Sequence, residues 1–233
     1  MERTSIIEGA APILIVAPHG GDNENMAFAA ETLARDFGAF AVINRGWKTA
    51  FHVDPLRDLA NCNDLRHLHE DVVREEFLNP IMRSVARIKR RYEGRVLMIV
   101  MKSCRDGVRT EAGDEILDMI VGYGSGNPPY HSCRIKTKNK FVRCLTNEGF
   151  EVFEGAAEGR HAAKSKNNLN QLFVRWNPDE NVESLQLEIV RELMLDQDMA
   201  MMTVDGLLCA MESFMDPDSD GGSEEQIMET KRI

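Results

Sequence analysis

An apolar run that ends abruptly in a glycine turn is the feature that most constrains this chain. Residues Ile13 to Ala17 are all apolar and rich in β-branched side chains, and Pro18-His19-Gly20-Gly21 follows at once. Such a run predicts a buried strand, and the glycines allow a sharp turn through backbone conformations that other residues rarely adopt. The apolar spacing from Asn25 to Phe37 then predicts a helix. This order predicts a site at the carboxyl end of a sheet strand, where open α/β sheets bind ligands.

Strand and helix signals alternate along the rest of the chain. This alternation predicts an α/β fold with a mixed, mainly parallel sheet flanked by helices on both faces. Pro80 marks either a kink or the start of a new helix capped by Asn79. The stretch from Arg45 to Arg66 has no period, so it is predicted to be a long and therefore often functional loop. The expected strands are 13–17, 40–44, 96–101, 117–121, 150–153 and 184–189, and the expected helices include 25–37, 138–147 and 200–215.

Length and charge limit the classes of protein that are compatible with the sequence. A chain of 233 residues fits one domain, which we expect over residues 1–215, and the acidic stretch 216–233 is expected to be a disordered tail. The formal net charge of −10 argues against nucleic acid and anionic membrane surfaces as partners. No apolar run approaches the roughly 20 residues that cross a bilayer, and the N-terminus lacks the layout of a secretory signal. We therefore expect a cytoplasmic protein.

The cysteines do not predict a disulfide framework. They are odd in number, scattered, and include no C-x-x-C pair. We expect reduced thiols, most of them buried as small hydrophobic side chains, at Cys62, Cys104, Cys133, Cys144 and Cys209.

The turn after the first strand carries two side chains suited to a metal. His19 and Glu24 offer a neutral imidazole and a carboxylate, which are two of the three protein ligands that a catalytic zinc commonly takes. In the plainer interpretation, the turn only caps the helix through Asp22 or Asn23. The glycines can also hold a phosphate through backbone N–H groups. The sequence lacks both the Lys-Ser/Thr of a P-loop and the glycine spacing of a dinucleotide site.

A second candidate group lies on the late strand. Period-two alternation puts Gln186 and Glu188 on one face, opposite the leucines. Two polar side chains on a core strand need partners, and a general base beside a metal-bound water would occupy such a position. The alternative is an edge strand with both side chains in solvent.

The loop 58–66 is the third candidate group. Its asparagines and Arg66 can form hydrogen bonds with a substrate carboxylate, although Asn and Asp are also ordinary turn residues. The nearby histidines, His52, His67 and His69, are expected to be surface or capping residues.

Together these groups resemble the N-formylglutamate amidohydrolase family and the related poly-gamma-glutamate hydrolases. The residues that carry the resemblance span roughly Ile13 to Leu195 and are Ala17-Pro18-His19-Gly20-Gly21 with Glu24, Asn44-Arg45, Asn61-Cys62-Asn63 and Gln186-Leu187-Glu188. The resemblance implies a zinc-carboxypeptidase-like three-layer sandwich. It also implies zinc held by His19 and Glu24, Glu188 as the base that deprotonates the zinc-bound water, and substrate contacts from Arg45, Asn63 and Gln186.

The sequence departs from the family at one position. The family has a third zinc ligand, a histidine, at the end of the strand that begins at Val96, whereas this chain has Met101-Lys102-Ser103-Cys104. Cys104 can substitute as a thiolate, His131 or His161 can reach in from another loop, or Lys102 can occupy the place of the cation.

Two functional hypotheses follow from this departure. The first is a zinc-dependent amidohydrolase that cleaves an amide bond of a small N-acyl amino acid or glutamyl peptide. The second is a non-catalytic binding protein on the same fold with a degenerate metal site. In both hypotheses the partner is a small molecule or a short peptide.

Overall fold

A computed structural model describes residues 3–49, 59–104, 118–126, 129–155 and 161–217. Within these residues seven strands form one sheet in the order β1-β3-β2-β4-β7-β5-β6. The strands are β1 (Thr4–Ile7), β2 (Ile13–Ala17), β3 (Phe40–Asn44), β4 (Val96–Cys104), β5 (Met119–Gly122), β6 (Val152–Glu154) and β7 (Val182–Val190). Neighbouring strands are parallel except in the pairs β1–β3 and β5–β7. The predicted mixed, mainly parallel sheet is therefore confirmed.

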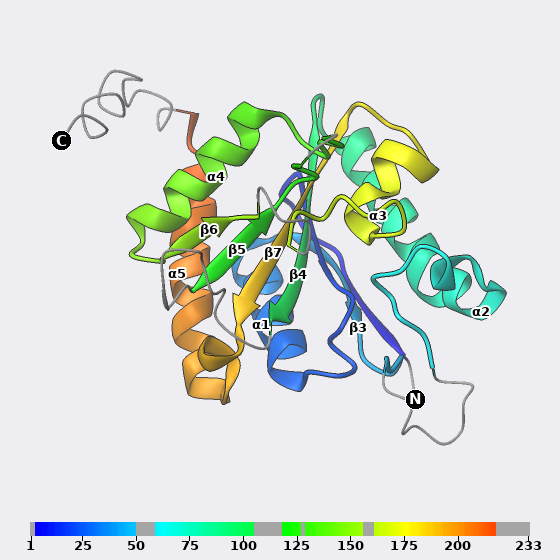
Figure 1. Cartoon of the computed structure of the whole chain (residues 1–233), viewed down its shortest axis with the longest axis horizontal. Helices are drawn as coiled ribbons and strands as arrows, with labels where there is room; N and C mark the ends of the chain where they lie inside the picture. The colour runs from blue at the N-terminus through cyan, green and yellow to red at the C-terminus, as the bar shows by residue number, and fades with distance from the viewer. Residues whose placement is uncertain (1–2, 50–58, 105–117, 127–128, 156–160, 218–233) are drawn as a thin grey trace.

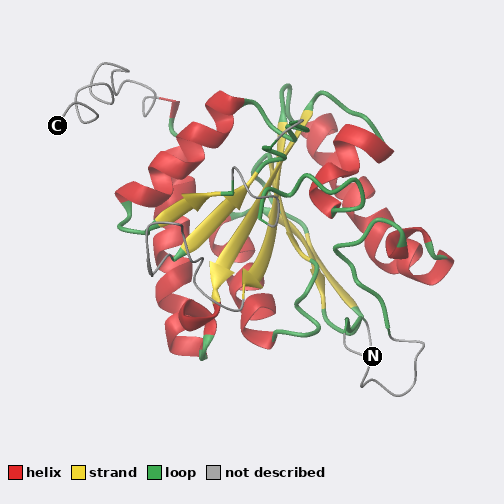
Figure 2. Cartoon of the chain, viewed as in Figure 1, coloured by secondary structure: helices red, strands yellow, loops and turns green. Residues whose placement is uncertain are grey.

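Helices cover both faces of this sheet, as Figure 2 shows. The α-helices are α1 (Glu24–Phe37), α2 (Asp71–Val73), α3 (Asn79–Arg91), α4 (Ile135–Asn147) and α5 (Gln197–Met215). Short helical turns complete the described elements: η2 (His67–His69), η3 (Arg74–Leu78), η4 (Leu169–Gln171), η5 (Leu172–Trp176) and η6 (Arg191–Met194). None of the helices in the described part of the chain is long and apolar enough to span a membrane.

The alternation of side chains along each strand divides the core into two layers. In β2, Ile13 and Ile15 pack with α1, α4 and α5 on one face, while Leu14 and Val16 pack with α3 and η5 on the other. Every residue of β2 is buried because helices cover both faces of the strand. The three-layer arrangement expected from the sequence is confirmed.

Most of the expected elements are present with shifted ends. The strands β2 and β3 have the expected bounds, whereas β4 and β7 extend farther than expected, to Cys104 and Val190. β1 was not expected, since it pairs antiparallel with β3 at the edge of the sheet and lacks a continuous apolar run. The helix α3 begins at Asn79, so Pro80 lies in its first turn and Asn79 is not the cap.

Two predictions concern residues outside the described part of the chain. The expected tail 216–233 lies there from residue 218 onward, as does His52 in the loop after β3. Four of the five cysteines are buried free thiols, as expected, and Cys209 is exposed.

The arrangement of the central strands fixes where a site can form. β2 pairs in parallel with β3 on one side and with β4 on the other. The connection after β2 therefore leads to one side of this strand, and the connection after β3 leads back to its other side. Loops diverge at such a switch point and leave a crevice beyond the carboxyl ends of the strands. His19 follows β2, and Lys102 to Cys104 end β4, so both segments border this crevice.

Candidate functional site

The turn between β2 and α1 is built from close backbone contacts. A Cβ on Gly20 would lie 2.4 Å from the carbonyl oxygen of Asn44, and one on Gly21 would lie 2.3 Å from that of Trp47. Neither glycine has a left-handed φ. The expectation of unusual backbone conformations was therefore wrong, because these glycines are required by lack of space. The turn leads into α1 through Asn23, whose side chain accepts a hydrogen bond of 3.0 Å from the Met26 N–H.

Asn44 and Arg45 have separate structural roles beside this turn. The buried Asn44 amide donates to the Pro18 oxygen at 2.7 Å and to the Trp47 oxygen at 2.8 Å, which ties the turn to the end of β3. Arg45 instead forms an ion pair with Glu31 of α1 and donates to the Ser5 hydroxyl at 3.2 Å. The geometry therefore does not bring the predicted substrate ligand Arg45 to the turn, and Arg45 does not line the pocket described next.

A pocket of about 700 Å³ lies at the carboxyl ends of β2 and β4. It brings together several residues that the sequence singled out, namely His19, Glu24 and Cys104, and adds charged side chains from Asp22 and Arg191. Its remaining lining residues are Asn23, Asn25, Thr49, Ser103, Met194 and Leu195. The structure thus places a pocket with charges of both signs at the predicted end of the sheet.

His19 is held as a neutral imidazole in this pocket. Burial and the nearby Lys102 charge lower the pKa of His19 to about 4, against smaller opposing effects of Asp22 and Glu188. Its Nδ1 atom lies 4.0 Å from the Asp22 carboxylate, which in turn accepts a 2.7 Å hydrogen bond from the Thr49 hydroxyl. Asp22 and Glu24 are both exposed, and of the two it is Asp22 whose carboxylate lies within ion-pair distance of the His19 ring. Asp22 is therefore the carboxylate that the geometry pairs with His19.

Glu188 is at the centre of a buried polar network. Its side chain is 4% exposed, and its Oε1 atom lies 3.1 Å from Lys102 Nζ. Oε1 also accepts from Gln186 Nε2 at 2.6 Å, and Oε2 lies 2.9 Å from His161 Nδ1. Both carboxylate oxygens are therefore occupied by protein partners. Buried polar groups with complete partners are the ordinary state of a folded core.

The charge state of Glu188 follows from these contacts. Burial raises the pKa of Glu188, but the His161 hydrogen bond and the Lys102 charge together outweigh burial and lower it. A carboxylate with a lowered pKa is a weaker proton acceptor than an ordinary one. Glu188 is thus held as an anion that is paired with a cation.

The position of Gln186 and Glu188 excludes the edge-strand alternative. β7 lies between β4 and β5, and both side chains are buried on the face opposite the leucines. Gln186 accepts a 2.9 Å hydrogen bond from Asn168. Figure 1 shows β4 and β7 side by side. Their parallel register places Lys102 opposite Glu188.

The other candidate residues have separate environments. The side-chain oxygen of Asn63 is buried without a hydrogen-bond partner. His131 is exposed and packs against the Tyr123 ring, whereas His161 forms a hydrogen bond with Glu188.

Burial and the Glu188 charge raise the pKa of Cys104 to about 11, so Cys104 is a neutral thiol. His67 accepts a hydrogen bond from the Asn61 N–H, and His69 packs against Trp176, as expected for surface or capping residues.

The donor set does not fit the expected zinc centre. Among the residues that the structure describes, no group of three or more His, Cys, Asp or Glu side chains can hold a metal ion. A catalytic zinc commonly takes three protein ligands. In addition, the Lys102 ammonium lowers the pKa of His19 through its charge, and the same charge opposes a metal cation there.

Three residues of the site had no specific signal in the sequence analysis. The sequence pattern marks Asp22 only as a candidate helix cap, although its spacing of three from His19 is short enough for contact. Arg191 directly follows β7, and charged residues at strand ends often border a site. Asn168 lies in an irregular segment, so only the tertiary structure brings it to Gln186.

Comparisons with known proteins support the fold. No family model and no curated protein matches the sequence. The structure is similar to that of an N-formylglutamate amidohydrolase from Ralstonia eutropha JMP134, with a TM-score of 0.57, 14% identity, and 92% of this chain and 97% of that chain covered. It is also similar to a bacteriophage poly-gamma-glutamate hydrolase, with a TM-score of 0.53, 10% identity, and coverage of 91% and 88%. A putative carboxypeptidase from Burkholderia mallei gives a TM-score of 0.51 at 12% identity, with 92% and 64% covered. The predicted likeness in fold is confirmed over about nine-tenths of the chain.

Proposed function

We propose that the pocket around His19 binds a short glutamyl peptide or a related small amino-acid derivative. Its lining carries Asp22 and Glu24 as acceptors for an ammonium or amide N–H and Arg191 as a partner for a carboxylate. A zwitterionic ligand needs both signs of charge within one small pocket. A volume of about 700 Å³ suits a ligand of this size.

The Lys102–Glu188 ion pair favours binding without hydrolysis. The residue expected to act as the base is buried, has both oxygens occupied, and lies 3.1 Å from an ammonium. Lys102 supplies a fixed positive charge in the part of the site where the resemblance predicts a metal. This single observation supports a non-catalytic binding protein on a hydrolase fold.

A second candidate function is zinc-dependent hydrolysis of the amide bond of the same ligand. It is favoured by a different observation, since the neutral His19 and the Asp22 carboxylate lie 4.0 Å apart and are two of the three kinds of ligand that a catalytic zinc commonly takes. Two proteins of similar fold are named for such reactions, an N-formylglutamate amidohydrolase and a poly-gamma-glutamate hydrolase.

Calorimetry and product analysis distinguish the two candidates. The purified protein is titrated with γ-glutamylglutamate and with N-formylglutamate, with and without added zinc, and the mixtures are analysed by mass spectrometry. Binding without turnover and without stoichiometric metal supports the binding protein. Cleavage that depends on zinc contradicts it and supports the amidohydrolase, and an absence of binding to both compounds contradicts both candidates.

Two variants connect the result to the pocket. Arg191→Ala removes the lining cation and is expected to weaken binding about tenfold or more, because a charge-assisted hydrogen bond is lost. Lys136→Ala, on the exposed face of α4 and outside the pocket, is the matched control and should bind as the unchanged protein does.

A further inference from the structure

A second pocket, of about 660 Å³, lies on the α3 face of the sheet. It is lined by Arg66, Lys166, Asn167, Arg175 and Trp176, and it shares no lining residue with the pocket around His19. Its residues come from two segments that the backbone holds together, since Leu65 N–H donates to the Asn167 oxygen at 2.7 Å. Figure 1 shows the later segment in yellow, beside α3.

The pocket has a positive charge in a protein of net charge −10. Arg66 is paired with Asp64 at 2.6 Å, so its charge is largely compensated. Lys166 and Arg175 form no ion pair with any carboxylate in the part of the chain that the structure describes. Two cations without a carboxylate partner, on the rim of one pocket, attract an anion.

The pocket also has a rigid aromatic surface. Trp176 is 40% exposed, and its ring stacks on His69 with centroids 4.7 Å apart. Its indole N–H donates to the Lys166 oxygen at 2.7 Å, which fixes the ring orientation. Arg175 is held as well, with its guanidinium 3.5 Å from the centre of the Tyr130 ring. A fixed ring loses little conformational entropy when a planar ligand stacks on it.

We infer that this pocket binds a nucleoside monophosphate. Such a ligand combines a planar base, which stacks on indole, with a phosphate, which accepts charge-assisted hydrogen bonds from Lys and Arg. The pocket opens to solvent, its volume of about 660 Å³ accommodates one small ligand, and the acidic remainder of the protein disfavours a longer polyanion. The base lies against Trp176, and the phosphate lies between Lys166 and Arg175.

Fluorescence and calorimetry with adenosine 5′-monophosphate test this inference on the whole 233-residue chain. The protein has two tryptophans, and Trp47 is only 2% exposed, so a ligand at the pocket changes the emission of Trp176. We expect quenching that saturates with AMP and is absent in Trp176→Phe, whose ring still stacks. Lys166→Ala and Arg175→Ala should each weaken AMP binding about tenfold or more, and Lys136→Ala should not change it.

Three further titrations separate the parts of the ligand. Adenosine and inorganic phosphate should each bind at least about tenfold more weakly than AMP, because each offers only one of the two groups. The inference is overturned if AMP does not bind, if adenosine or phosphate binds as tightly as AMP, or if a single-stranded oligonucleotide binds more tightly. Circular dichroism of each variant confirms that a loss of binding does not reflect unfolding.

Discussion

Lys102 on β4 and Glu188 on β7 face each other across neighbouring parallel strands, with Nζ and Oε1 3.1 Å apart. Their register places the ammonium beside the carboxylate without help from any loop. Lys102 also affects His19, because burial first of all and then the Lys102 charge lower the pKa of its imidazole. A single lysine near the end of a strand therefore pairs with Glu188 and also lowers the pKa of His19.

The first prediction concerns the strength of this pair. Lys102→Met keeps most of the side-chain volume but leaves Glu188 with only its neutral donor and His161. We expect the free energy of unfolding to fall by about 2 kcal/mol, the usual cost of losing a hydrogen bond to a charged group. Urea denaturation measures this change in the free energy of unfolding. The double variant Lys102→Met/Glu188→Gln should recover part of the loss, and additive losses would contradict coupling.

The second prediction concerns pH. The folded pKa of His19 is about 4, below the ordinary value of 6.5, so the unfolded chain binds more protons between these values. The contribution of His19 to stability is full above about pH 6.5 and is lost as the pH falls toward 4, by up to about 3 kcal/mol. Denaturation at several pH values measures this loss. The dependence should largely disappear in His19→Gln, and an equal slope in that variant would assign it to other groups.

NMR gives a direct check of the same group. The His19 ring signals should stay close to those of a neutral imidazole between pH 8 and pH 5, because a ring with a pKa of about 4 is largely deprotonated in this range. In Lys102→Met the midpoint should rise, since a positive charge near the ring has been removed. A midpoint near 6.5 in the unchanged protein would contradict the buried, neutral state.

The third prediction separates two reasons why a position requires glycine, namely lack of space for a Cβ and a left-handed backbone conformation. In Gly21→Ala the new Cβ would lie 2.3 Å from the Trp47 oxygen, and we expect a loss of about 2–3 kcal/mol from overpacking. In Gly38→Ala the space is open but φ is +75°, so only the left-handed conformation costs energy, about 1 kcal/mol. Thermal denaturation compares the two variants. Equal losses would show that space does not limit the turn.

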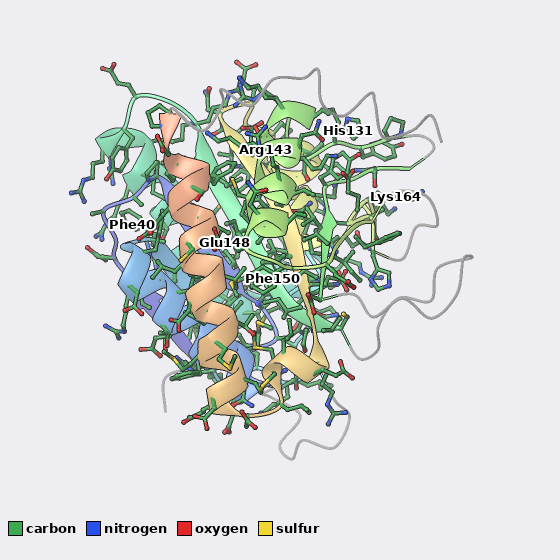
Figure 3. The ribbon with its side chains drawn as sticks, turned by 90° about the vertical axis from the view of Figure 1, so that its left-hand side faces the viewer. Phe40, His131, Arg143, Glu148, Phe150 and Lys164 are labelled. Carbon is green, nitrogen blue, oxygen red and sulfur yellow. The ribbon has the colours of Figure 1, made fainter. Side chains whose placement is uncertain are left out.

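The fourth prediction concerns Gly206 in the middle of α5. Alanine usually stabilises a helix interior by about 1 kcal/mol relative to glycine, but here a Cβ would lie 2.6 Å from the Phe150 ring. Figure 3 labels this ring beside α5. We expect Gly206→Ala to destabilise the unchanged protein and to stabilise the Phe150→Leu variant. The same sign of effect in both backgrounds would contradict the contact.

The fifth prediction concerns the thiols. Cys209 is exposed, whereas burial raises the pKa of Cys133 to about 12 and that of Cys104 to about 11. Iodoacetamide should therefore label Cys209 first in the native protein, as peptide mass spectrometry will show. Labelling of all cysteines at one rate would indicate that the core is open. Cys209→Ser removes the fast phase and is the control.

The sequence alone determined the elements that depend on local pattern. The apolar run of β2 predicted its strand with the correct bounds, and the spacing after it predicted α1 to within one residue. The two-residue alternation around Gln186 and Glu188 predicted that both share one face. These features follow from the periods of strands and helices, which do not depend on distant contacts.

Only the tertiary structure decided which of these side chains meet. In the structure Glu188 pairs with Lys102 and His161, and Arg45 pairs with Glu31. These pairs cannot be predicted from local pattern, because strand order and register are set by contacts between segments far apart in the chain. It also showed that Gly20 and Gly21 are required by the carbonyl groups of Asn44 and Trp47 rather than by their own backbone angles. The sequence therefore located by itself the end of the sheet where this pocket lies, and the three-dimensional packing determined which charged side chains line it.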